Sequence, residues 1–295
     1  VDDISFVNNG ANPHKIHRGA GDFIADGFTD GCQVLVSGAG QALNNRLFMV
    51  VNVGVNDLTL IRADVVTAES AGSFITITTK EKRLQDGMSE TFFNTNFLLR
   101  TLYLTGPNAY EMDPADRLIF KMWAARDSGS TGSTVTISTE GTLYRTYLQT
   151  AFNTVGFTGS FGYTGSRGWQ GDQGYQGYQG EEGITSGRVF YPRHSGTSTL
   201  PQDPEARGDE LYGTATALPS PNAESDISIT LADGSGDRVY GGSFATVAGE
   251  PGMSIYPRGT TYQYVYCKVS NAATTAVVYF DVFQYKTTGN IATTG

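Results

Sequence analysis

Charged side chains are scarce in this sequence. Asp, Glu, Lys and Arg together make up 17% of its 295 residues, and the net charge is −9 with no compensating basic cluster. Because contacts between basic side chains and phosphates dominate nucleic acid binding, we expect no nucleic acid partner. The sequence also lacks a run of 18 apolar residues, so we expect no insertion into a membrane.

Cysteine is almost absent. The two cysteines, Cys32 and Cys267, lie far apart and belong to no disulfide framework or metal-binding motif. We expect them to be two small buried hydrophobic residues, with a disulfide between them as the alternative.

The three histidines form no recognisable centre. His14 and His17 have a spacing that on a helix could begin a metal site, but no Cys, Asp or Glu nearby completes it. Pro13 and an Asn/Gly-rich lead-in predict a solvated loop for this segment, and we expect His194 in a loop as well. The sequence has no nucleophile elbow, metalloprotease motif or convergent Cys/His/Asp set. We therefore expect no catalytic residues, no metal, no cofactor and no enzymatic activity.

Glycine and aromatic residues are abundant, with 37 Gly, 16 Tyr and 16 Phe. Together with recurring Thr and Val, this composition is typical of many short strands joined by tight turns. It predicts an all-β fold built from small β-barrel or sandwich domains. Strands are expected at 33–36, 47–53, 58–61, 73–79, 97–104, 117–125, 134–138, 143–149, 226–231, 242–247, 261–269 and 276–285.

One segment has glycine at every third position without interruption. These glycines are Gly156, Gly159, Gly162, Gly165, Gly168, Gly171, Gly174, Gly177, Gly180 and Gly183. A collagen triple helix requires this period, because every third residue faces a crowded axis that admits no Cβ. A flexible Gly-rich linker would explain the glycine content but not the period. The segment predicts a triple helix with these glycines at the axis, and hence a homotrimer.

The repeat contains no proline, which ordinary collagen uses to pre-set its backbone. Its outward positions hold aromatic residues instead, which we expect to pack between chains: Phe157, Phe161, Tyr163, Trp169, Tyr175 and Tyr178. So short a proline-free helix needs folded domains beside it to keep three chains in register. At about 3 Å of rise per residue the rod would be roughly 80 Å long.

The repeat divides the chain into regions. We expect a small β-domain at 1–79, a β-sandwich or half-sandwich at 80–155, the collagen-like triple helix at 156–183, and a sandwich or complementary half at 184–295. Tyrosines are numerous on the expected strands and turns: Tyr103, Tyr110, Tyr144, Tyr147, Tyr256, Tyr262, Tyr264 and Tyr266. Cross-strand packing is the simpler expectation for them, and contact with a sugar or receptor is the alternative.

Several stretches of the sequence resemble phage structural proteins. Residues 21–60, beginning GDFIADGF, resemble a small phage β-domain, and GFTGSFGYTGSRG is similar to glycine-triplet runs in cyanophage virion proteins. Residues 249–295 resemble one half of a phage β-sandwich, and residues 112–124 together with 141–150 resemble the other half, in reversed order. Either the halves pair within a permuted chain, or each belongs to a different repeat of a longer array.

This resemblance implies a virion or extracellular location. The sequence therefore predicts a trimeric fibre or appendage protein that projects β-domains on a collagen-like rod, for attachment to a host. The expected partners are other virion proteins, neighbouring fibre subunits, and a host-surface glycan or receptor. One alternative is a filament in which each chain's C-terminal half completes the next chain's 80–151 half. Another is a fibre tip that binds or cleaves polysaccharide.

Overall fold

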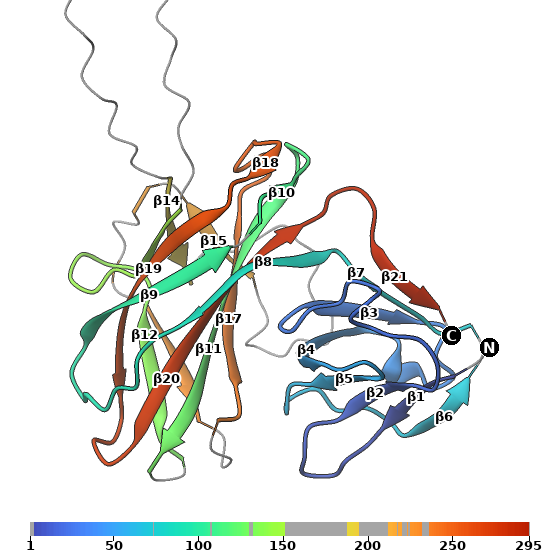
Figure 1. Cartoon of the computed structure of the whole chain (residues 1–295). Helices are drawn as coiled ribbons and strands as arrows, with labels where there is room; N and C mark the ends of the chain where they lie inside the picture. The colour runs from blue at the N-terminus through green and yellow to red at the C-terminus, as the bar shows by residue number, and fades with distance from the viewer. Residues whose placement is uncertain are drawn as a thin grey trace, which may run out of the picture.

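A computed structural model describes residues 3–72, 74–106, 108–129, 132–150, 188–194, 212–216, 218–219, 223, 225–231 and 236–294. The fold is all-β, as predicted, with a nine-stranded β-barrel and an eight-stranded antiparallel sheet. Within the described ranges there is no α-helix, only one 3-10 turn, η1 (Ala42–Asn44). Figure 1 shows the barrel and the sheet side by side.

The barrel draws its strands from both sides of the glycine repeat. They are β8 (Glu81–Met88), β9 (Leu98–Gly106), β11 (Arg117–Ser128), β13 (Tyr147–Gln149), β14 (Val189–Arg193), β15 (Tyr212–Thr216), β17 (Val239–Thr246), β19 (Gly259–Val269) and β20 (Thr275–Tyr285). Four more strands accompany them: β12 (Thr134–Ser138), β16 (Asp226–Thr230), β10 (Tyr110–Glu111) and β18 (Ile255–Tyr256).

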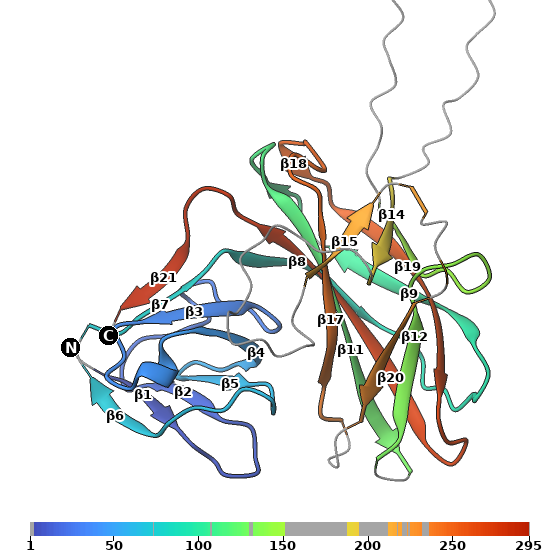
Figure 2. The ribbon, with the colours of Figure 1, turned by 180° about the vertical axis from the view of Figure 1, so that it is seen from behind.

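The barrel closes because the long strand β19 is shared. The strand order runs β13-β14-β15-β17-β11-β20-β8-β9-β19, and β13 pairs with β19 to complete the ring. Further along the same edge, β19 pairs with β12, which carries β16 outward. The turned view in Figure 2 shows β17, β11 and β20 running side by side on the barrel wall.

The barrel core follows the two-residue period of its strands. On β20, Val278, Phe280 and Val282 point inward and are fully buried, as their alternation predicts. Phe120 on β11 packs 5.5 Å from Phe190 and 6.5 Å from Phe280, ring to ring. Each such side chain contributes about 1.5–3 kcal/mol on burial, so this core is the main source of barrel stability.

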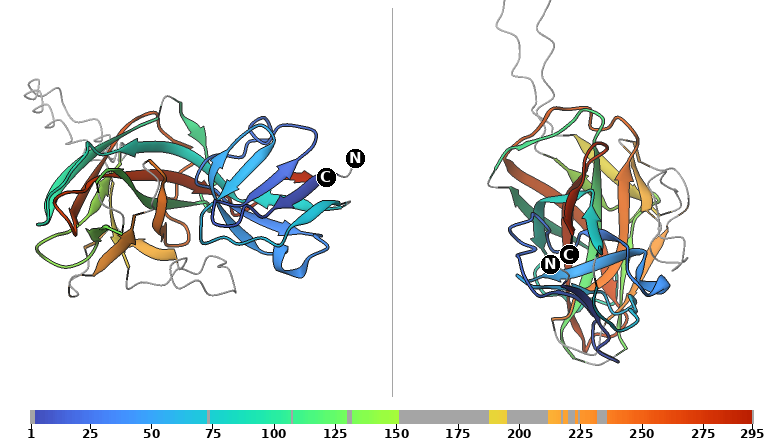
Figure 3. Two further views of the ribbon diagram at one scale, coloured as in Figure 1. Left: turned by 90° about the horizontal axis from the view of Figure 1, so that it is seen from below. Right: turned by 90° about the vertical axis from the view of Figure 1, so that its right-hand side faces the viewer.

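The eight-stranded sheet contains the N-terminal strands and one C-terminal strand. Its strands are β1 (Ile4–Val7), β2 (Lys15–Arg18), β3 (Gln33–Ser37), β4 (Leu47–Val53), β5 (Asp57–Leu60), β6 (Glu69–Gly72), β7 (Thr76–Thr79) and β21 (Ile291–Thr294). β21 follows β20 of the barrel and pairs antiparallel with β7, so it forms one edge of this sheet (Figure 3).

The outer face of the barrel wall packs against this sheet. Ile119 of β11 and Phe283 of β20 are fully buried in the core of the N-terminal sheet rather than in the barrel core. The Lys121 ammonium lies 4.6 Å from the Phe283 ring centroid and donates hydrogen bonds to the Gly31 carbonyl at 2.6 Å and to the Glu81 carboxylate at 2.5 Å. The contact is therefore an apolar interface that contains a fully buried ion pair.

Strands from the expected 80–155 and 184–295 regions alternate in one barrel. β11 lies between β17 and β20, and β19 lies between β9 and β12. Of the two arrangements left open by the sequence, the structure shows the halves paired with each other.

Both cysteines are free and buried, as the simpler expectation had it. Cys267 lies in the barrel core and Cys32 in the core of the N-terminal sheet, so they are not paired. Burial raises the pKa of each thiol to about 12.

Candidate functional site

The glycine repeat joins the barrel at one narrow place, which we call the mouth: Thr150, Arg188 and the β17–β18 loop beside them. β13 and β14 are adjacent and antiparallel, with Leu148 opposite Phe190. The Thr150 amide and hydroxyl both donate to the Arg188 carbonyl, at 2.9 and 2.8 Å. The two ends of the intervening segment are thus hydrogen-bonded to each other.

Arg188 also fastens the mouth to the rest of the barrel. Its guanidinium donates to the Pro251 carbonyl at 2.7 Å and to the Glu250 carboxylate at 3.1 Å. Two planar contacts from one guanidinium fix both position and direction, which a single lysine would not do. These contacts fix the positions at which the chain leaves β13 and enters β14.

The predicted triple-helix residues all belong to the segment that starts and ends at the mouth. The ten glycines from Gly156 to Gly183, and the aromatics Phe157, Phe161, Tyr163, Trp169, Tyr175 and Tyr178, lie outside the described residues. Their roles therefore stay predictions.

Aromatic rings cover the barrel surface next to the mouth. This tyrosine face consists of Phe97, Tyr103, Tyr144, Tyr147, Tyr191, Tyr262, Tyr264 and Tyr266. Tyr147 stacks on Tyr264 at 4.5 Å between ring centroids, and Tyr103 meets Tyr262 edge-on at 5.6 Å. These are the cross-strand contacts expected from the sequence.

The same rings remain partly open to solvent. Tyr103 is 62% exposed and Tyr262 is 38% exposed. Partial burial, together with the neighbouring phenols of Tyr264 and Tyr191, raises the pKa of Tyr147. Lys268 lies 4.3 Å from the Phe97 ring centroid, which adds a cation to the edge of the face. The arrangement offers flat apolar rings with hydroxyl groups, a surface that can stack on a planar or sugar-like ligand.

Two of the eight predicted surface tyrosines have other roles. Tyr256 is only 1% exposed, and its hydroxyl donates to the Gln85 side chain at 2.6 Å inside the barrel. Tyr110 lies in a separate hollow at the β10 end of the barrel, with the Lys82 ammonium 4.9 Å from its ring centroid.

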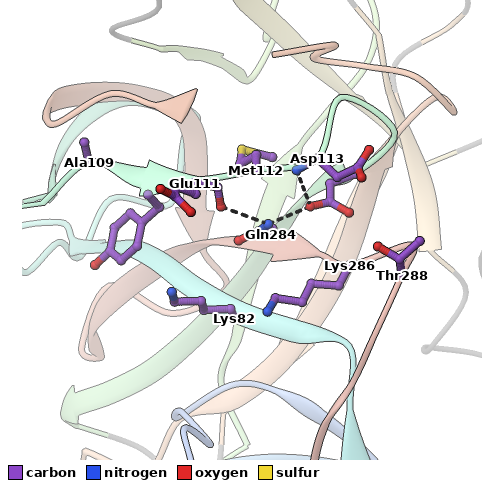
Figure 4. A pocket seen from close by; sticks show the side chains of 10 residues that line it. Lys82, Ala109, Glu111, Met112, Asp113, Gln284, Lys286 and Thr288 are labelled. Atoms are coloured by element: carbon purple, nitrogen blue, oxygen red, sulfur yellow. Dashed lines mark hydrogen bonds between the residues drawn. The ribbon is translucent and has the colours of Figure 1, made fainter. Parts of the chain in front are cut away.

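That hollow, of about 560 Å³, is drawn in Figure 4. Its back wall is a hydrogen-bond network centred on Asp116. The Gln284 amide donates to the Asp116 carboxylate at 2.6 Å, and the Thr287 backbone amide donates to it at 2.9 Å. Partial burial pushes the pKa of Asp116 upward, but these hydrogen bonds and one from the Asp113 amide outweigh it and hold the pKa below its usual range. The network ties the start of the β20–β21 connection to the turn before β11.

The prediction of a loop at His14–His17 is wrong. Lys15–Arg18 form β2 in the middle of the N-terminal sheet, paired on both sides. His14 is 4% exposed and accepts a hydrogen bond from the Asn9 amide, and His17 contacts the Asp57 carboxylate at 2.8 Å. His194 lies exposed in a turn, as predicted. No cluster of three or more metal-ligating side chains occurs in the part of the chain that the structure describes.

Sequence reasoning missed the buried charges between the barrel and the sheet. Asp281 is 1% exposed, and neither of its carboxylate oxygens has a hydrogen-bond partner among the described residues. The available signal was one Lys and one Asp inside otherwise apolar strands, at Lys121 and Asp281. Those positions face outward from the barrel, and only the sheet docked there makes them buried.

Comparison with known proteins gives this chain no relative: no family model matches it, and neither the curated proteins nor the solved structures contain a match. The described residues include no helix long and apolar enough to cross a bilayer.

Proposed function

We propose that this chain is a non-enzymatic structural subunit of a trimeric extracellular fibre, an appendage of a phage virion. The observation that carries the proposal is the unbroken three-residue glycine period of 156–183 attached to a braced mouth. In this proposal three chains wind into a triple helix through that segment, and the β-barrels flank it.

The mouth supplies what a proline-free triple helix needs. Proline restricts the backbone of the unfolded chain and so reduces the entropy that is lost when a triple helix forms. Without proline, folded domains must hold the ends of the three chains together. The β13–β14 hydrogen bonds and the Arg188 contacts provide a rigid starting point on each barrel. Trimerisation then multiplies weak contacts, so a modest affinity at one barrel becomes useful avidity at three.

The tyrosine face favours a role in attachment. Rings such as Tyr103 and Tyr262, left partly exposed beside the mouth, suit stacking on the apolar faces of a host-surface glycan or receptor. Replacing both by Ser should abolish retention on a column of host envelope glycan while leaving particle mass unchanged. Full retention by the double variant would remove the tyrosine face from the proposal.

A pair of matched substitutions tests the triple helix. Gly168→Val places a branched side chain at the axis, whereas Gln170→Val changes an outward position two residues away. We expect the first to lower the midpoint of the collagen-type circular dichroism melt by several degrees and the second to leave it nearly unchanged. Equal effects of the two variants would contradict the triple helix.

A further inference from the structure

The two halves of the barrel cannot form separate sheets. Among the described strands of the barrel, only β8–β9, β14–β15 and β15–β17 pair within one half of the chain. Every other pairing of the barrel joins a strand before the glycine repeat to a strand after it. In Figure 1, the blue-green to green strands β8, β9 and β11 accordingly share one wall with the orange to red strands β17, β19 and β20. Each half exposes unpaired strand edges until the other half arrives, and such edges are strong templates for pairing with another chain.

The covalent connection between the halves sets a length requirement. A straight triple helix over 156–183 separates its own ends by roughly 80 Å, at about 3.1 Å per residue. Nine residues remain on its flanks, 151–155 and 184–187, and they span at most about 32 Å when fully extended. Yet Thr150 and Arg188 are hydrogen-bonded neighbours at the mouth. One chain cannot contribute an unbroken rod and also supply both sides of the same mouth.

The glycine register gives no place for the chain to turn back. The three-residue spacing continues through Gly165, Gly168, Gly171 and Gly174, the middle of the segment, with no proline and no change of phase. A reversal there would put residues with side chains at the axis and would break the feature that defines the repeat.

We infer that the barrel is closed between copies of this chain: the 81–150 half of one copy is completed by the 188–294 half of another. This inference rests on the proposed triple helix. It identifies the partner of the mouth as a second copy of the chain, which uses the same strand pairings that the structure shows. β21 of the donating copy then pairs with β7 of the accepting copy, so the N-terminal sheet is shared as well.

Strand exchange of this kind gives an open assembly. Three barrels whose mouths face a common axis form what we call a node. One triple helix leaves this node, and another arrives from the opposite side. The contact is head-to-tail and does not close on itself, so it generates a filament. We expect nodes of three barrels separated by rods of roughly 80 Å.

A cysteine pair across the two halves tests the exchange on the full chain. The hydroxyl oxygens of Ser128 on β11 and Thr275 on β20 lie 2.6 Å apart on the exposed surface. In the double variant Ser128→Cys/Thr275→Cys, the two sulfurs therefore fall within disulfide reach. The native cysteines are buried and do not interfere. We expect covalent multimers on a non-reducing denaturing gel, and their collapse to one chain on reduction.

A second cysteine pair, placed within the N-terminal sheet, provides the control. Lys15→Cys/Thr59→Cys joins directly opposed residues of β2 and β5, so it should give an intrachain disulfide in any assembly. The single variant Ser128→Cys reports random oxidation. A Ser128–Thr275 pair that runs only as an internally bridged single chain would overturn the exchange.

The mass of the same sample separates this inference from the proposed function. An intrachain bridge in particles of three subunits overturns the exchange and leaves a trimeric fibre with a shorter or interrupted rod. Interchain bridges in particles whose subunit number is not a multiple of three support the exchange and overturn the triple helix.

Discussion

Asp281→Asn should stabilise the protein, and the gain should depend on pH. The Asp281 carboxylate is 1% exposed, with no hydrogen-bond partner among the described residues. Burial raises its pKa to about 6, and nearby Asp86 adds to the effect, while Arg238, Arg83 and Lys121 oppose it. Above this pKa, the Asp281 carboxyl group ionises although its charged form is poorly solvated in the buried site.

The magnitude follows from the size of the pKa shift. A rise from 3.8 to about 6 corresponds to ~3 kcal/mol, at about 1.4 kcal/mol per pKa unit. Between these values the folded protein keeps the proton and the unfolded chain releases it, so the free energy of unfolding falls as pH rises. The loss is complete above the folded-state pKa. Asn cannot ionise and avoids the loss.

Urea unfolding of both proteins at about pH 4 and about pH 8 measures the effect. We expect the variant to match the wild type at the lower pH and to exceed it by up to ~3 kcal/mol at the higher pH. Asp226→Asn, at an exposed strand position on β16, is the matched control for the replacement of a carboxylate by an amide. The reasoning is refuted if Asp281→Asn has the same effect at both pH values.

One substitution tests the contact between the barrel and the N-terminal sheet, and one labelling experiment tests the two cores. Lys121→Met removes the buried ammonium that donates to the buried Glu81 carboxylate, so it should cost about 3–5 kcal/mol in urea unfolding; a loss below about 1 kcal/mol would mean that the pair is not buried. Cys32 and Cys267, with thiol pKa values raised to about 12, should resist iodoacetamide at neutral pH in the folded protein and react fully in denaturant; rapid labelling of the native protein would place a thiol at the surface.

The sequence predicted strands best where a short run rich in apolar residues is bounded by turn-forming residues. The ranges 47–53 and 134–138 match the observed β4 and β12 at both ends. β8 escaped prediction because its sequence, EKRLQDGM, is largely polar, and it is a strand only because β20 pairs along it. The short strands β1 and β2 were missed for a similar reason, since their pairing with each other and with β5 determines their conformation.

The candidate site was predictable only in part. The glycine period and the surplus of tyrosine are local properties of the sequence, so both could be recognised in it. The mouth was not, because Thr150 and Arg188 are brought together by the closure of the barrel rather than by a local motif. The buried Lys121 and Asp281 likewise depend on which sheet packs against the barrel wall, a long-range fact that strand alternation does not contain.

The most direct test of the trimeric fibre is the mass of the purified chain by sedimentation equilibrium. With 31.6 kDa per subunit, the account predicts particles whose mass is three subunits or a multiple of three. A monomer that persists at high concentration would mean that the glycine period is not wound into a triple helix, and it would contradict the fibre.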